Sequence, residues 1–565
     1  MRPLAKVAAL AALAVGALSA CGGVPTSGPI QQGPVVAAAG DNQFIRVIAR
    51  PPVDGMSPEA IVQGFQEATA SPDPGYAVAR AYLTAPAGAT WDPTAGVEIY
   101  DSNGLTTTVK NGSVAQAGVL TGTIGATGEY AVARPESKRV WDYTLSKVDG
   151  QWRIASLPDG LVLSPGDIAR SYRTFDLYFW TRDLTTLVPA PVTIPISETG
   201  TATQLVRGLL TGPTPWIAPA VQTGFPEGTR LAVDSVPVVD GIAQVALSRE
   251  VLNADDVTRQ KLSAQLTWTL RQLPDVTGVL ISVNGQPLPV GGSAAVQPID
   301  SWPSVNPDAL SARATAYALS KGVVVKLSAD SASTPVAKVR PAIALPAVSL
   351  DLTRLAGVGD NGSTLFSGRL DDGALSPVFE GSDLSRPSWD SAGNLWVADR
   401  GRGVVLLRGT KATRVAIGDV QPGFDPAGVT ALAVSRDGTR LAMLVRRGSD
   451  IEPWVARIER SGDQIKVAAP RRVTAEVVEA VDLAWLDADT IAVLGSSAGQ
   501  SQLDVIELGV GSSRMRTTLA PDKRATTVAA APDRPELLGD GTSTWRATVP
   551  SWTLVPGVTD AVYPG

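Results

Sequence analysis

The segment AVSRDGTRLA at residues 433–442 decides the fold of the C-terminal half of the chain, because related segments recur along it. The turn residues at its centre favour a tight turn, and the apolar residues on either side favour two paired strands. The other copies are AVSLDLTRLA at 347–356, PSWDSAGNLW at 387–396, AWLDADTIA at 484–492 and, more weakly, APDRPELL at 531–538. The aliphatic residue after each turn recurs every 40–50 residues, as Leu355, Leu395, Leu441, Ile491 and Leu537.

A hairpin repeated with this period predicts the blades of a β-propeller. We expect about five to seven blades over residues 296–565, in a ring whose closure hides the sheet edges. The stretch GVGDNG at 357–362 fits G-x-G-x-x-G, but it lies inside a predicted hairpin and opens no helix, which favours a turn over a phosphate loop. Four tryptophans of this region are predicted to lie in blade cores: Trp389, Trp396, Trp454 and Trp485.

The composition narrows the possible functions. Of the 565 residues, 44% are hydrophobic and 18% are charged, as in a globular chain of about three or four domains. The net charge of −6, with no basic run, argues against a nucleic-acid partner. The sequence contains no histidine, which excludes Ser-His-Asp and Cys-His catalysis and the common histidine-zinc sites. Carboxylate-pair hydrolysis and calcium binding stay open, although the Asp-rich stretches 371–373 and 487–489 lack a complete calcium loop and are predicted turns.

The N-terminus predicts export and lipidation. Arg2 and Lys6 precede an apolar run over 7–18 that is too short to span a membrane, and LSAC follows at 18–21. This pattern predicts a signal peptide over 1–20 and resembles a bacterial lipobox. The resemblance implies that Cys21, the only cysteine, becomes the N-terminus and carries an S-diacylglycerol and an N-acyl group. Several acyl chains make a lasting anchor; the alternative is a secreted protein with an unmodified thiol.

Residues 21–45 contain many Pro, Gly, Gln and Ala residues and predict a flexible tether. Residues 46–170 then predict an α+β domain. Ser57, followed by Pro58 and Glu59, is a helix-start signal, and a second helix is predicted from Tyr76 to Leu83. Helices followed by short strands, ending in GQWRI at 150–154, resemble an NTF2-like domain. Such domains often have a pocket, and a packed adaptor without a ligand is the other interpretation.

Residues 171–295 predict a second α+β domain, with strands at 175–180, 230–236, 242–247 and 276–283, a short helix at 203–210 and an amphipathic helix from Asp256. LLTGP at 209–213, FPEGT at 225–229 and LTWTLRQLPDV at 266–276 resemble the GerMN domain, an extracytoplasmic module. The acidic residues of this region are predicted to serve turns and helix caps rather than catalysis: Glu227, Asp234, Asp240, Asp255 and Asp256.

In order, the lipobox, VPTSGP at 24–29, the NTF2-like domain, the GerMN domain and the propeller resemble the actinobacterial LpqB lipoprotein family over essentially the whole chain. The resemblance implies an anchor in the cell membrane at its extracytoplasmic face. It also implies an accessory role in an MtrA–MtrB-type two-component system. In that role the chain binds the sensor region of an MtrB-like histidine kinase and influences envelope homeostasis and cell division.

Two other functions stay open. One is a sensor that binds an envelope fragment or a sugar in the propeller channel or in a pocket of the NTF2-like domain. The other is a carboxylate-dependent hydrolase of envelope polymers, which needs two close acids, one with a raised pKa. We expect no enzyme, no metal and no cofactor, and Cys21 is the only residue to which the sequence assigns a functional role.

Overall fold

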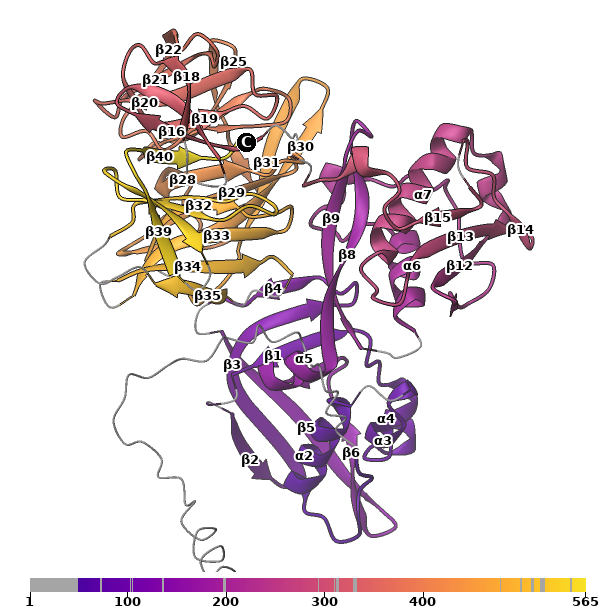
Figure 1. Ribbon diagram of the computed structural model, residues 1–565. Helices are drawn as coiled ribbons and strands as arrows, with labels where there is room; N and C mark the ends of the chain where they lie inside the picture. The colour runs from indigo at the N-terminus through magenta and orange to yellow at the C-terminus, as the bar shows by residue number, and fades with distance from the viewer. Residues whose placement is uncertain are drawn as a thin grey trace, which may run out of the picture. The chain divides into compact units, whose positions relative to one another are not determined.

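The computed structural model describes residues 49–565 apart from 72–73, 102, 104, 135–136, 197–199, 293, 309, 311–313, 329–332, 478, 498–499, 510–512, 519–523 and 549–550. The predicted signal peptide, the tether and Cys21 therefore lie outside the described residues. Figure 1 shows two α+β domains, drawn in indigo to magenta, and an all-β domain drawn in salmon to yellow. The predicted fold class, α+β domains combined with an all-β propeller, is confirmed.

The first domain packs short helices against a curved sheet. Its helices are α2 (Pro58–Thr69), η1 (Pro74–Tyr76), α3 (Ala77–Arg80), α4 (Ala85–Thr90) and α5 (Pro165–Ser171). Its strands are β1 (Gly96–Tyr100), β2 (Thr106–Lys110), β3 (Ser113–Gly125), β4 (Tyr130–Val132), β5 (Lys138–Val148), β6 (Gln151–Ser156) and β7 (Leu161–Leu163). The strand order is β6-β5-β3-β1-β7, and β3 also pairs with β2 through its first half and with β4 through its second half.

The predicted start of the first helix is confirmed. Ser57 is the N-cap of α2, because its hydroxyl accepts a hydrogen bond from the backbone N–H of Ala60. The second helix predicted from Tyr76 is wrong in length, since α3 ends at Arg80. Leu83 instead forms a β-bridge with Ile154, which ties this segment to the sheet.

The second domain contains two small sheets around two helices. Its helices are α6 (Thr201–Thr211), η3 (Ala218–Ala220), η4 (Arg249–Asn253) and α7 (Asp256–Leu270). One sheet has the order β10-β8-β9, with β8 (Tyr172–Thr181), β9 (Leu187–Pro195) and β10 (Val221–Gln222). The other has the order β11-β12-β13-β14, and β15 also pairs with β13; its strands are β11 (Val238–Val239), β12 (Ile242–Leu247), β13 (Gly278–Val283), β14 (Gln286–Pro287) and β15 (Val296–Pro298).

Two predictions for this domain are wrong. The strand predicted at 230–236 is irregular apart from one bridge between Leu231 and Leu247. The N–H of Val236 donates to the hydroxyl of Thr203 instead, and Pro237 follows, which has no N–H for a sheet.

Helix α7 is not amphipathic, because every residue of 262–270 is buried. Two of its polar side chains bond to the backbone of β8: Gln265 donates to the carbonyl of Tyr178, and Thr269 accepts from the N–H of the same residue. These bonds allow Gln265 and Thr269 to be buried, whereas the hydroxyls of Ser263 and Thr267 are buried without a hydrogen-bond partner.

The third domain contains six sheets among the described residues, which agrees with the prediction of about five to seven blades. The 3₁₀ helix η5 (Pro303–Val305) precedes them. The second to sixth sheets are listed in chain order. The second sheet contains β19 (Ile343–Val348), β20 (Arg354–Gly359), β21 (Thr364–Arg369) and β22 (Leu375–Glu380), and the third contains β23 (Ser388–Trp389), β24 (Leu395–Asp399), β25 (Gly403–Arg408) and β26 (Lys411–Arg414). The fourth contains β27 (Ile417–Gly418), β28 (Val429–Val434), β29 (Arg440–Arg447), β30 (Asp450–Ser461) and β31 (Gln464–Arg472), with the 3₁₀ helix η6 (Pro426–Gly428) before β28. The fifth contains β32 (Ala480–Trp485), β33 (Thr490–Ser497), β34 (Gln500–Glu507) and β35 (Ser513–Thr518), and the sixth contains β36 (Thr527–Ala529), β37 (Leu537–Gly539), β38 (Thr544–Thr548) and β39 (Ser551–Val555).

The first sheet closes the ring with strands from both ends of the domain. It combines β16 (Ala316–Ser320), β17 (Val323–Leu327) and β18 (Ser333–Lys338) with β40 (Thr559–Val562), in the order β18-β17-β16-β40. Tyr317 pairs with Val562 across this closure, and both side chains are buried. Pairing the last strand with the first strands removes two open sheet edges.

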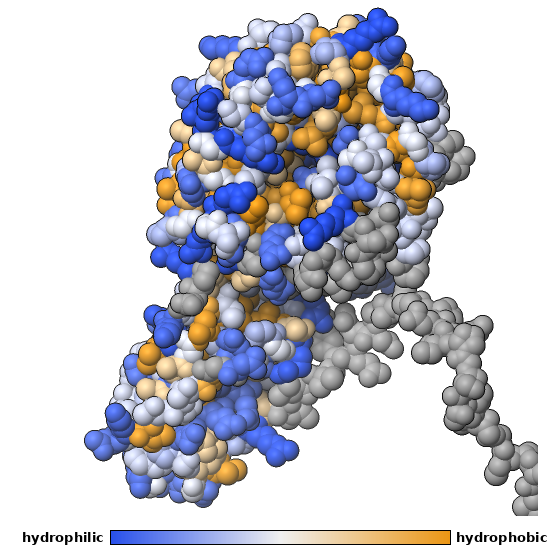
Figure 2. Space-filling model, turned by 90° about the vertical axis from the view of Figure 1, so that its left-hand side faces the viewer, coloured by the Kyte–Doolittle hydropathy of each residue, from blue (hydrophilic) through white to orange (hydrophobic). Residues whose placement is uncertain are grey.

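The repeated hairpins form as predicted. Leu441 in β29 pairs with Val434 in β28, and Leu355 in β20 pairs with Val348 in β19. All five repeated aliphatic residues are buried, as are the four tryptophans predicted to lie in blade cores. The G-x-G-x-x-G stretch spans the end of β20 and the turn before β21, as expected of a hairpin. Figure 2 shows one face of the molecule, on which hydrophobic and hydrophilic residues are interspersed.

Candidate binding site at the junction of the three domains

Two of the acidic residues of the second domain serve a helix cap and a turn, as predicted. The Asp255 carboxylate accepts from the N–H of Thr258 and caps α7. Asp240, at a φ of 50°, lies in the turn between β11 and β12. Asp234 forms an exposed ion pair with Arg207. Among the described residues, no group of three or more His, Cys, Asp or Glu side chains could hold a metal ion.

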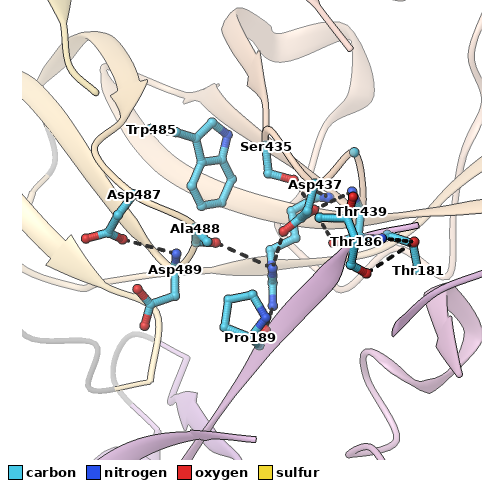
Figure 3. Close-up of polar contacts among 12 residues, drawn as sticks. Thr181, Thr186, Pro189, Ser435, Asp437, Thr439, Trp485, Asp487, Ala488 and Asp489 are labelled. Carbon is cyan, nitrogen blue, oxygen red and sulfur yellow. Dashed lines mark hydrogen bonds and ion pairs between the residues drawn. The ribbon is translucent and has the colours of Figure 1, made fainter. Parts of the chain in front are cut away.

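Arg440, a residue of the repeat, joins the propeller to the second domain. Figure 3 shows Asp437 and Ala488 of the propeller beside Pro189 of β9. Its side chain is 1% exposed and lies 3.2 Å from the carboxylate of Asp437. The guanidinium also donates to the carbonyl oxygens of Ala488 in the propeller and Pro189 in β9. The hydroxyl of Ser435 and both the N–H and the hydroxyl of Thr439 donate to Asp437, which fixes this carboxylate within the turn. The two terminal nitrogens of this buried cation are therefore paired across the interface, while its Nε has no hydrogen-bond partner.

Several carboxyl groups lie close to this contact and have raised pKa values. Burial raises the pKa of Asp308 to about 7, and the charge of Asp487 raises it further, while Arg436 opposes the shift. Burial also raises the pKa of Asp176 and Asp489. One carboxylate oxygen each of Asp176 and Asp308 is buried without a hydrogen-bond partner. The interface is therefore more favourable when these groups are protonated.

Trp216, which follows α6, is the centre of a second contact with the propeller. Its indole N–H donates to the carbonyl of Ala469 over 2.8 Å, and its own carbonyl accepts from Arg457 over 2.8 Å. A β-bulge exposes the first acceptor, because Ala469 and Pro470 of β31 face a single residue of β30. Ala469 has a φ of 50°, and Pro470 has no N–H for the ladder.

Arg471 brings the first domain into the same junction. Its guanidinium lies 3.9 Å above the ring of Trp216 and 2.6 Å from the carboxylate of Glu129, which precedes β4. Burial lowers the pKa of Arg471, and the charge of Glu129 opposes that shift. One side chain of the propeller thus contacts both other domains.

A cavity of about 580 Å³ opens beside these contacts. Its walls come from β4 and Arg134 in the first domain, from Trp216 in the second, and from Trp454, Arg472 and Leu508 in the propeller. The volume falls in the range of small-molecule sites, about 300–1,000 Å³. The edge of the Trp454 ring packs against Phe424 with centroids 5.3 Å apart, which keeps this wall in place.

Glu452 is the buried charge of the cavity wall. Its side chain is 3% exposed, and one of its carboxylate oxygens lies 3.2 Å from Arg472 and 3.7 Å from Arg447. Its other oxygen, Oε2, has no hydrogen-bond partner, and neither has the Nε of Arg472. Burial lowers the pKa of Arg472, whereas Glu452 opposes the shift. Beside the cavity, one acceptor and one donor are therefore buried with unmet hydrogen-bonding capacity.

The two locations predicted for a ligand differ from this cavity. A cavity of about 60 Å³, lined by inner-strand residues such as Ser388 and Ala433 and by Tyr563 near the end of the chain, occupies the propeller channel. In the first domain, predicted to be NTF2-like, Phe65, Trp91 and Tyr143 fill the space between α2 and the sheet with edge-to-face ring contacts. The junction offers much more room than the channel.

Sequence reasoning missed the junction, because its residues come from three separate segments. One local signal was available: Pro470 interrupts an otherwise regular strand, which indicates an edge or a bulge. The arginines Arg440, Arg471 and Arg472 carry no pattern that separates them from surface arginines.

The chain matches three families. Residues 51–169 match the family described as Lipoprotein LpqB, N-terminal domain, and residues 322–564 match the Lipoprotein LpqB beta-propeller domain. Residues 176–289 match Germane, described as sporulation and spore germination.

Lipoprotein LpqB of Thermobifida fusca is 32% identical over an alignment that covers 100% of this chain and 99% of that protein. The chain belongs to the LpqB lipoprotein family. The LpqB protein of Streptomyces coelicolor is 29% identical and covers 99% of this chain and 98% of that protein. Among solved structures, the first GerMN domain of GerM from Bacillus subtilis is 27% identical and covers 22% of this chain and 97% of that chain, with a TM-score of 0.20.

The LpqB family name designates a lipoprotein and no reaction. Membership agrees with the predicted lipoprotein character of this chain. Within the part of the chain that the structure describes, no helix is both long and apolar enough to cross a membrane.

Proposed function

We propose that the chain is a lipid-anchored accessory protein that binds the extracytoplasmic sensor region of an MtrB-like histidine kinase. A signal peptide over 1–20 is removed, Cys21 carries the lipid, and residues 21–45 tether three domains over 46–170, 171–295 and 296–565 to the outer face of the cell membrane. The role is one of binding and not of catalysis. The observation that carries the proposal is the full-length match to LpqB lipoproteins.

The lipid anchor strengthens a weak contact. Anchoring the chain in the same membrane as the kinase raises their effective concentration, so a modest affinity suffices. Binding the sensor region then biases the conformational equilibrium of the kinase and with it the phosphorylation of its response regulator.

The first two domains supply the favoured contact surface. Among the described residues, the large aliphatic side chains that stay exposed concentrate there, including Val109, Val140, Val233 and Leu252, whereas the propeller, which is similar in size to the two domains together, has Val420, Val481 and Leu554. Apolar side chains within a polar surround can form the core of a transient protein interface.

The test is binding of the chain from Gly22 onward to the purified sensor region, followed by biolayer interferometry. We expect saturable binding in the micromolar range, weakened at least about tenfold by V233D/L252D or by V109D/V140D. The matched control V481D/L554D, on the propeller, should bind as the unchanged chain does. Absence of saturation up to about 100 µM would rule the kinase contact out.

A further inference from the structure

The junction cavity has the features of a ligand site that the proposed function does not use. Three domains contribute its walls, and its volume of about 580 Å³ suits a small molecule. Two tryptophans, Trp216 and Trp454, lie in these walls, together with apolar side chains such as Val132, Val473 and Leu508. These groups supply the apolar contact area that a ring-shaped ligand needs.

The charges on the walls select an anion. Four arginines line the cavity, namely Arg134, Arg447, Arg471 and Arg472, against the two glutamates Glu129 and Glu452. Arg471 is paired with Glu129, and Arg472 is paired with Glu452. Arg134 and Arg447 are exposed to solvent where they line the cavity, and Arg447 reaches Glu452 only at 3.7 Å. Positive charge therefore exceeds negative charge on the accessible side of the site.

Glu452 adds a second requirement, because its free oxygen must meet a donor. This oxygen is buried and has no partner, and leaving a buried acceptor unpaired is unfavourable. The alkyl chain of a fatty acid has no donor for that oxygen and leaves it unpaired. A hydroxyl group donates to it, and a neighbouring ring or hydroxyl oxygen can accept from the free Nε of Arg472.

We propose that this cavity binds an acidic sugar, that is, a hydroxylated ring that carries a carboxylate or phosphate group. The anionic group pairs with Arg447 and Arg134, a hydroxyl donates to Glu452, and the ring contacts the tryptophan wall. A neutral sugar leaves the excess positive charge unmatched, and a fatty acid leaves Glu452 unmatched. The proposal does not depend on the kinase contact.

Calorimetric titration of the chain from Gly22 onward with four probes tests this assignment. The probes are glucuronate, glucose 6-phosphate, glucose and octanoate. We expect saturable binding of glucuronate or glucose 6-phosphate, whichever anion the arginines favour, and binding of glucose and octanoate weaker by at least about tenfold. The two acidic sugars distinguish a carboxylate-bearing ligand from a phosphate-bearing one.

Arg447→Ala and Arg446→Ala form a matched pair. Both side chains are exposed in β29, but they point to opposite faces of the strand, and only Arg447 lines the cavity. Arg447→Ala should weaken binding of the acidic sugar about tenfold or more, while Arg446→Ala should change it less than about twofold.

Hydrogen exchange supplies a second readout, since the bound ligand should slow exchange of the amides at 129–134 in the first domain. The assignment is overturned if neither acidic sugar binds at up to about 10 mM. Equal affinity for glucose or octanoate, or equal losses in the two arginine variants, would overturn it as well.

Discussion

Replacing Arg440 by alanine tests how the propeller and the GerMN domain hold together. The side chain is 1% exposed, and its guanidinium pairs with Asp437 and donates to the carbonyls of Ala488 and Pro189. Removing one partner of a buried ion pair costs about 3–5 kcal/mol. Because Ser435 and Thr439 still donate to one oxygen of Asp437, we expect the lower end, about 3 kcal/mol.

Hydrogen exchange measured on the whole chain reports this loss of stabilising free energy at individual amides. The measurement therefore does not require the domains to unfold together. Amides of β9 and of residues 435–441 should exchange more than about a hundredfold faster in Arg440→Ala, as 3 kcal/mol requires. Arg440→Met keeps most of the buried volume, so its amide exchange rates should lie between those of the unchanged chain and those of Arg440→Ala. This variant supplies the measurement if the alanine variant fails to fold.

The matched control for this experiment is Arg354→Ala. Arg354 occupies the equivalent position in the first copy of the repeat, but its side chain is exposed and lies 5.6 Å from the ring centroid of Trp389. Removing the Arg354 side chain should lower the local stability by no more than about 1 kcal/mol. If both variants accelerate exchange equally, or if Arg440→Ala leaves β9 unchanged, the buried contact does not hold the two domains together.

Three further predictions follow from pH dependence, ring closure and lipidation. Burial raises the pKa of Asp308 to about 7, so the folded protein holds a proton that the unfolded chain releases above about pH 4, and stability should fall as the pH rises from about 4 through 7. The urea midpoints at about pH 5.5 and about pH 8 should differ less in Asp308→Asn than in the unchanged chain. An equal difference in the two proteins would contradict a role for Asp308 in the pH dependence. Ala561→Asp places a charge in the closing strand at a side chain that is 4% exposed and should destabilise the propeller by more than about 3 kcal/mol, whereas Leu554→Asp, at an exposed site, should stay within about 0.5 kcal/mol in the same urea titration. Cys21→Ser should move the expressed protein from the detergent phase to the aqueous phase on phase partitioning; retention in the detergent phase would exclude this cysteine as the anchor.

Local patterns in the sequence predicted most of the helices and strands. Ser57 and Asp255 cap their helices because a short polar side chain can reach the free N–H groups of the first turn. The five hairpin copies are equally local, since a tight turn and its two strands lie within about ten residues. Where an element depends on a distant partner, prediction failed. Residues 230–236 look like a strand, but the N–H of Val236 bonds to Thr203 of helix α6.

The sequence by itself determined the order of the domains and the repeated hairpins of the propeller, because each hairpin is specified by adjacent residues. The sheet that closes the ring required the tertiary structure, since β16 and β40 lie at opposite ends of the domain and share no repeat. The tertiary structure also showed which arginines are buried at a contact between domains. Arg440 and Arg354 occupy the same position in two copies of one motif, yet one is buried against Pro189 and the other is exposed to water. The environment of a side chain depends on what packs over it, and no local pattern encodes that neighbour.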